Sequence, residues 1–286
     1  MNKASAIIAT FLFFICAGVV LSQDDAVKAE KAVKAERAGK YKEFCSNHWS
    51  NGDKVSVSDL RVSTLPATGS LNIDSGRNGG ISVKGENRQD VLLRACVQAW
   101  GITENDAQSI ASNVRISTNG QVKAEGPDHG WSVSFEAHVP LNTNLLLRAQ
   151  NGGIGISSVE GMLEFETVNG GVSLKDVAGD VRGRTTNGGV NVVLAGNAWK
   201  GPGLDVQTTN GGVNLMMPET YAANIETGTV NGGFKSDIPS LNIATEDVRG
   251  GWNNRSKEIR TSINGGGAPI KVTTRNGGIR IRALSN

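Results

Sequence analysis

The segments TTNGGVNV (residues 185–192) and TTNGGVNL (residues 208–215) decide the fold, because they are two copies of one recurring unit. Asn-Gly-Gly occurs eight times, and a ninth copy, Asn119-Gly120-Gln121, lacks the second glycine. A unit that cannot bury its apolar face alone predicts a solenoid, in which successive units stack. The eight asparagines are Asn78, Asn151, Asn169, Asn187, Asn210, Asn231, Asn264 and Asn276.

The spacing of the triplets indicates the size of the unit. From Asn151 to Asn231 the successive gaps are 18, 18, 23 and 21 residues, roughly one coil of a β-helix each. Longer gaps of 41 and 33 residues indicate skipped or inserted copies, and Arg249-Gly250-Gly251 lies about where one triplet is missing. Asn264 precedes Asn276 by only 12 residues, which predicts a different corner on the far side of the coil that ends at Asn276.

Residues on both sides of each triplet alternate with the period of a β-strand. After the asparagine, positions three and five are apolar and the residue between them is small or polar, as in Val172-Ser173-Leu174. Two short strands with apolar faces inward are therefore expected to meet at each triplet, with Asn and Gly accepting a positive φ. Stacked asparagines are expected to form a hydrogen-bonded ladder. Its predicted members are Asn151, Asn169, Asn187, Asn210, Asn231 and Asn276.

Composition fits a thin aliphatic core. Of the 286 residues, 37 are glycine and only 5% are aromatic. The formal net charge of +2 is too balanced to indicate nucleic acid or an acidic surface as a partner. Asn-Gly-Gly is not followed by a phosphate-binding or dinucleotide pattern, so no cofactor is predicted.

The first residues have the pattern of a signal peptide, with Lys3 before an apolar stretch and small residues at Val20 and Ser22. We predict a signal peptide over residues 1–22 and an exported mature chain that begins at Gln23. An uncleaved membrane anchor is the alternative. Cys16 lacks the small residues that precede a lipoprotein cysteine, and no second apolar span of about 20 residues follows.

Two helices are predicted. Residues 23–43 contain a six-residue repeat rich in Ala, Lys and Glu, which favours a charged helical spacer; a stalk or partner-binding helix is the alternative. Thr103-Glu104-Asn105-Asp106 resembles a capping box and predicts a short inserted helix through about Ser112. The β-solenoid domain is expected to span residues 44–286.

Cys45 and Cys96 remain as a pair in the exported chain, which predicts a disulfide in an oxidising compartment. Two separate buried thiols are the alternative. No histidine spacing accompanies them, so no metal site is predicted.

Outward charged positions raise the alternative of a polysaccharide lyase or glycoside hydrolase. Five residues before the asparagines, successive units carry Glu164, Arg182, Asp205, Glu226 and Lys271. The signs mostly alternate, which favours ion pairs between strands; Glu226 beneath Asp205 is the one like-charged pair. His48, His129 and His138 have no catalytic or metal-ligand spacing and are predicted to be surface or turn residues. No catalytic residue is predicted.

The chain resembles the provisionally named bacterial adhesin domains of unknown function that are related to the auto-transporter adhesin head (GIN) domain. The residues that carry the resemblance are the repeated triplets, the run Val139–Leu145 and the ending Ile270–Ile281, over roughly residues 60–286. The resemblance implies a right-handed parallel β-helix on an exported protein, and it supplies no catalytic residues.

The expected fold is therefore all-β: a single right-handed parallel β-helix with a short N-terminal helix and one inserted helix. The expected function is non-enzymatic binding of an unknown surface protein or glycan, in the periplasm, on the cell surface or outside the cell. The alternatives are the polysaccharide-acting enzyme and an envelope scaffold that self-associates through the ends of the β-helix.

Overall fold

The computed structural model describes residues 44–46, 54–238, 241 and 257–284. The chain divides into two compact units, Met1–Phe44 and Cys45–Asn286, and all described residues except Phe44 belong to the second. The predicted signal peptide, the helical spacer and the Arg249-Gly250-Gly251 triplet lie outside the described residues.

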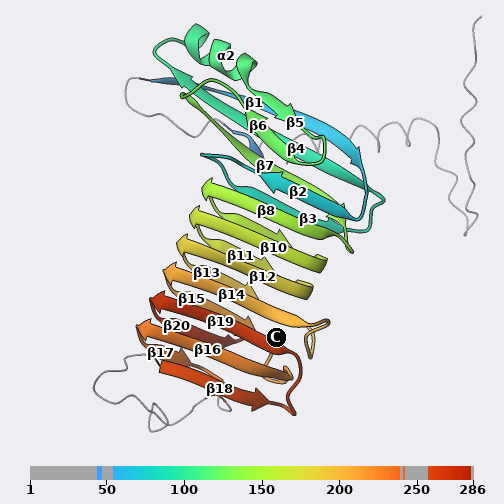
Figure 1. Cartoon of the computed structure of the whole chain (residues 1–286), viewed down its shortest axis with the longest axis vertical. Coiled ribbons are helices and arrows are strands. Elements are labelled where there is room, and N and C mark those ends of the chain that lie inside the picture. The colour runs from blue at the N-terminus through green and yellow to red at the C-terminus, as the bar shows by residue number, and fades with distance from the viewer. Residues whose placement is uncertain (1–43, 47–53, 239–240, 242–256, 285–286) are drawn as a thin grey trace, which may run out of the picture. The chain divides into compact units, whose positions relative to one another are not determined.

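The second unit contains two ten-stranded sheets, coloured along the chain in Figure 1. Sheet I has the order β1 (Val55–Pro66), β4 (Asp90–Gly101), β7 (Trp131–Pro140), β3 (Ile81–Glu86), β9 (Ile154–Ser157), β11 (Val172–Lys175), β13 (Val190–Val193), β15 (Val213–Met217), β20 (Ile279–Ala283), β17 (Phe234–Ser236). Sheet II has the order β18 (Lys257–Ile263), β16 (Ala223–Asn231), β19 (Pro269–Asn276), β14 (Gly203–Asn210), β12 (Ala178–Asn187), β10 (Glu160–Asn169), β8 (Asn144–Asn151), β2 (Ser70–Asp74), β6 (Val122–Glu125), β5 (Arg115–Ser117).

Between β8 and β15 the chain passes alternately from sheet II to sheet I, crossing at each Asn-Gly-Gly triplet. Each strand pairs in parallel with the strand one repeat away, as the spacing predicts. Val172 pairs with Val190 in sheet I, and Asn169 pairs with Asn187 in sheet II. Equivalent residues of successive repeats therefore face one another, and the register is the same throughout these strands.

Both ends of the sheets depart from the parallel pattern. β1, β4 and β7 pair in antiparallel fashion, as do β5 with β6 and β16 with β18. The 41-residue gap after Asn78 is explained by the inserted segment from β4 to β6, which includes helix α2 (Glu104–Asn113). Asn119-Gly120-Gln121 precedes β6 in sheet II, so this copy is not in line with the other triplets.

The last repeat is placed out of sequence order. β19 lies between β14 and β16, and β20 lies between β15 and β17. The turn at Asn264 joins β18 to β19, at the opposite end of β19 from Asn276. It is therefore a different corner, as its short spacing predicts.

The inward faces of the two sheets form one aliphatic core. The apolar residues that follow each triplet are buried, with Val172 2% and Leu174 0% exposed. Fully burying one such side chain contributes about 1.5–3 kcal/mol. The residues between them point outward on sheet I. A ligand can therefore reach the repeats from the outer face of this sheet.

Helix α2 begins as its sequence predicts. Thr103 and Asp106 form a reciprocal capping box, and Ala107 and Ala111 bury the helix against the sheets. Arg61 of β1 donates to the carbonyl oxygen of Ala111 over 2.9 Å. A cation at this position stabilises the negative end of the helix dipole.

Candidate binding surface

The asparagines of the triplets form a hydrogen-bonded column. From Asn151 onward, each side-chain amide donates to the amide oxygen of the asparagine before it in the column, as from Asn187 to Asn169 and from Asn210 to Asn187, both over 2.8 Å. The column runs Asn78, Asn151, Asn169, Asn187, Asn210, Asn276, Asn231. Asn276 precedes Asn231 because β19 is inserted between β14 and β16. These side chains bond to one another, so their repetition has a structural cause.

The expectation that the triplets need a positive φ is wrong for six of the seven stacked copies, and holds only for the Asn78 copy, in which Gly79 has a φ of 135°. Positive φ also occurs at other turns, at Ser158 and Asp176, and at the separate corner of Asn264. The first glycine of each triplet is needed for another reason. A Cβ at Gly188 would lie 2.0 Å from the carbonyl oxygen of Gly170 in the neighbouring repeat, so only glycine fits.

The threonine two residues before the asparagine completes the corner. Thr185 is buried and donates through Oγ1 to the carbonyl oxygen of Gly170 over 2.8 Å. The same bond recurs from Thr167, Thr208, Thr229 and Thr274. The sequence showed this threonine as a regularity, but its partner lies in another repeat.

The outer face of sheet II carries ion pairs between strands. Arg184 pairs with Glu166 over 2.9 Å. The prediction that Glu226 lies directly beside Asp205 is wrong, because Lys271 of the inserted β19 lies between them. The Lys271 ammonium is 3.5 Å from Asp205 and 3.8 Å from Glu226. Asp205 and Glu226 are therefore each beside a cation and not beside each other.

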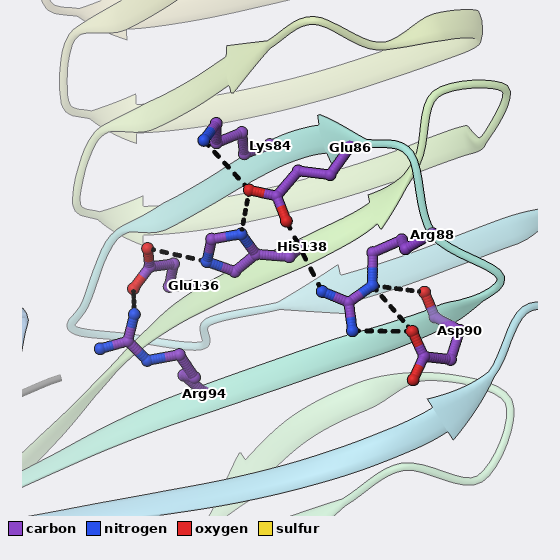
Figure 2. A network of polar contacts seen from close by, with 7 residues as sticks. All are labelled: Lys84, Glu86, Arg88, Asp90, Arg94, Glu136 and His138. Carbon is purple, nitrogen blue, oxygen red and sulfur yellow. Dashed lines mark hydrogen bonds and ion pairs between the residues drawn. The ribbon is translucent and has the colours of Figure 1, made fainter. Parts of the chain in front are cut away.

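A network of charged side chains lies on the outer face of β3, β4 and β7 (Figure 2). His138 lies between two carboxylates: Nδ1 is 2.9 Å from Glu86 and Nε2 is 3.2 Å from Glu136. Arg94 pairs with Glu136 over 2.6 Å, and Lys84 with Glu86 over 3.0 Å. The charged imidazolium can donate from both ring nitrogens at once, one to each carboxylate, whereas a neutral imidazole can donate from only one. His138 is therefore a strand residue on the outer face of β7 and part of a network, and not a turn residue.

The pKa values of this network follow from these bonds. The hydrogen bond to Glu136 raises the pKa of His138 despite partial burial, and the bond to Glu86 adds to it. The bond from His138 lowers the pKa of Glu136, and Arg94 adds to this. Burial acts to raise the pKa of Glu86, but the bonds from His138 and Lys84 together lower it. Both carboxyls are thus ionised at neutral pH.

A cavity of about 400 Å³ lies on the same face of sheet I, towards the start of β1. Its walls include Trp100, Gln98 and serines of β1 and β7. Trp199 lines a second cavity of about 490 Å³ beside the loop from Ala195 to Lys200. Trp199 is buried and donates to the carbonyl oxygen of Gly179, while Trp49 and Trp252 lie outside the described residues.

An open groove of about 1120 Å³ follows the triplets along sheet I. Its floor is the second glycine of successive triplets, and its wall is the outward residue of each strand: Ser173, Asn191, Asn214, Arg280 and Lys235. The Asn214 amide donates to Asn191 over 2.7 Å. The groove is thus neutral and polar over its centre and carries cations at the β20–β17 end.

The structure joins Cys45 and Cys96 in a disulfide, with the Cα atoms 5.4 Å apart. Of the histidines, His129 is exposed in a loop and His48 lies outside the described residues. In the described ranges, no group of three or more His, Cys, Asp or Glu side chains is placed to hold a metal ion. No helix of the same ranges is long and apolar enough to span a membrane.

No family model matches the chain, and no curated protein matches it. Three solved structures, all with provisional names, are similar to it. A cell adhesion protein from Clostridium sporogenes is 10% identical, with 80% of this chain and 100% of that chain covered and a TM-score of 0.41. An adhesin from Bacteroides fragilis is 9% identical, with 79% and 97% covered and a TM-score of 0.31. A lipid-binding protein from Parabacteroides distasonis is 8% identical, with 80% and 97% covered and a TM-score of 0.25. Likenesses this remote carry no functional argument.

Proposed function

We propose that this chain is an exported, non-enzymatic protein that binds its ligand on the outer face of sheet I. We further propose that its parallel strands form a right-handed β-helix. The observation that carries the binding role is the open groove over the glycines, which extends across several repeats. A surface of this kind fits an extended ligand, because it exposes backbone and small polar side chains in a regular row.

The charged network is what an enzyme would have to use, and its electrostatics oppose this. Glycoside hydrolysis requires one carboxyl that is still protonated near neutral pH, with a raised pKa. The pKa values of Glu86 and Glu136 are both lowered, and that of His138 between them is raised. The network therefore supports a structural role in joining β3, β4 and β7.

Self-association through the sheet ends is also less well supported. The edge strand β18 carries Arg260, which pairs with Glu258 over 2.6 Å and with Glu226 over 3.5 Å. Charged side chains on an edge strand oppose the addition of another strand. The disulfide is consistent with export to an oxidising compartment.

The mature chain from Gln23, produced in an oxidising compartment, should be screened on a glycan array and against cell-surface extracts. The Ser173→Trp/Asn191→Trp variant, which fills the groove centre with side chains, is the matched comparison. Binding that this variant loses, with no turnover of the bound glycan, supports the proposal. Turnover of a glycan, or binding that the filled groove retains, would contradict it.

A further inference from the structure

One end of the groove carries three cations close together. Arg280 and Arg282 are two residues apart in β20 and so project from the same face. Lys235 of β17 lies directly opposite Arg280 in the parallel register. All three side chains line the groove, although 45 residues separate Lys235 from Arg280 in the sequence.

These cations are not neutralised within the described residues. Several outward cations on other strands are paired, as in Arg184 with Glu166 and Lys271 with Asp205. In the ranges 54–238 and 257–284, Lys235, Arg280 and Arg282 form no ion pair with a carboxylate. Like charges on directly opposite residues destabilise a sheet. Lys235 and Arg280 are such a pair, and Arg282 lies on the same face of β20, so an anionic ligand here would offset their repulsion.

The remainder of the groove indicates the class of ligand. Ser173, Asn191 and Asn214 present hydroxyl and amide groups along its wall, and these can hydrogen-bond to neutral hydroxyls. Arginine matches the planar carboxylate in geometry as well as in charge. We propose that the groove binds a carboxylated polysaccharide, with uronate carboxylates at Lys235, Arg280 and Arg282 and sugar hydroxyls along the polar wall.

Nucleic acid fits this groove less well. Proteins that bind single strands use aromatic side chains on which the bases stack. The one aromatic residue that lines the groove is Phe234, and it packs against the core. The formal net charge of +2 also means that the chain as a whole lacks the strong positive charge typical of nucleic-acid-binding proteins.

The inference rests on the proposed binding function and names its ligand class. The test is binding of oligogalacturonate, its methyl ester and oligo-dT to the mature chain by calorimetry. Oligogalacturonate should bind, and the affinity should fall several-fold from about 50 to about 300 mM salt because screening weakens exposed charge pairs. The neutral ester should bind at least about tenfold more weakly.

Two triple variants complete the test. K235S/R280S/R282S removes the cluster and should weaken oligogalacturonate binding at least about tenfold. R148S/R182S/R184S removes three exposed cations from sheet II and should leave the affinity unchanged, so it controls for total charge. Equal losses in the two variants, no oligogalacturonate binding, or tighter oligo-dT binding through the same cluster would overturn the inference. If the groove binds only a neutral glycan or a protein, the inference fails and the proposed function stands.

Discussion

Gly188→Ala should destabilise the protein far more than an exposed Gly→Ala change normally does. The new Cβ would lie 2.0 Å from the carbonyl oxygen of Gly170 and 2.4 Å from its carbonyl carbon. That oxygen also accepts the hydrogen bond of Thr185, so it cannot move away without breaking the bond. Forcing one methyl group into a packed site typically costs about 1–3 kcal/mol. Because the clash is with backbone, we expect a loss of about 2–3 kcal/mol in the free energy of unfolding.

The matched control is the next residue of the same triplet. A Cβ at Gly189 would lie 3.4 Å from the carbonyl oxygen of Gly212, an ordinary contact. Neither glycine has a positive φ, so backbone strain does not distinguish the two positions. Gly189→Ala should therefore change the free energy of unfolding by less than about 1 kcal/mol.

Urea unfolding of the two variants, followed by tryptophan fluorescence, measures the difference. Comparison of the midpoints at a common slope gives the change in free energy for each variant. If Gly188→Ala and Gly189→Ala unfold at the same urea concentration, close approach between repeats is not the reason for the first glycine.

Three further predictions concern the column, the disulfide and the charged network. Asn187→Val breaks two ladder bonds and should lower the free energy of unfolding by about 1–3 kcal/mol, whereas Arg184→Ala should lower it by at most about 1 kcal/mol; equal urea midpoints would contradict this. Unreduced protein in denaturant should have no titratable thiol at Cys45 or Cys96, and two free thiols would show that the disulfide does not form. Reduction should lower the melting temperature, because closing this loop contributes about 4 kcal/mol. Folding raises the pKa of His138, so its stabilisation is present below the ordinary histidine pKa and lost as the pH rises through the folded pKa. His138→Gln should therefore lower stability by up to about 1 kcal/mol near about pH 6 and by much less near about pH 9; a loss independent of pH would contradict the charged form.

The repeated part of the fold could be predicted because the residues that determine each strand and turn lie within a single repeat. Val172, Ser173 and Leu174 alternate inward and outward, and the constant spacing of the triplets sets the register. The capping residues of α2 are likewise adjacent in sequence. The expectation that the glycines provide a positive φ considered only the backbone of one repeat. Gly188 is needed because of its contact with Gly170, which belongs to another repeat and could not be seen in the sequence of one repeat alone.

The strand order could not be predicted. Nothing near Lys271 indicates that β19 enters between β14 and β16, and this placement replaces the expected Asp205–Glu226 contact by two ion pairs. The same rearrangement brings Arg280 beside Lys235. Each lies four residues after its asparagine, at the same position of the repeat as Ser173, but only the order of sheet I makes them neighbours.

The charged network of Figure 2 could not be predicted for a similar reason. Glu86 and His138 are 52 residues apart, and β3 and β7 are brought together by the inserted segment between Asn78 and Asn151. Within β7, the one sequence feature that pointed to the network was Glu136, which lies two residues from His138. The alternation of β7 placed both side chains on one face but did not identify their partners.

Cross-linking of outward residues tests most directly whether each repeat adds one strand to sheet I in register. Ser173 pairs with Asn191, and Asn191 pairs with Asn214. Neighbouring strands lie about 4.8 Å apart, within the Cα range of a disulfide, whereas strands two apart are beyond it. After mild oxidation, mass spectrometry should therefore find a new disulfide in Ser173→Cys/Asn191→Cys and two free thiols in Ser173→Cys/Asn214→Cys. A cross-link in the second variant, or none in the first, would contradict the parallel stacking of the repeats.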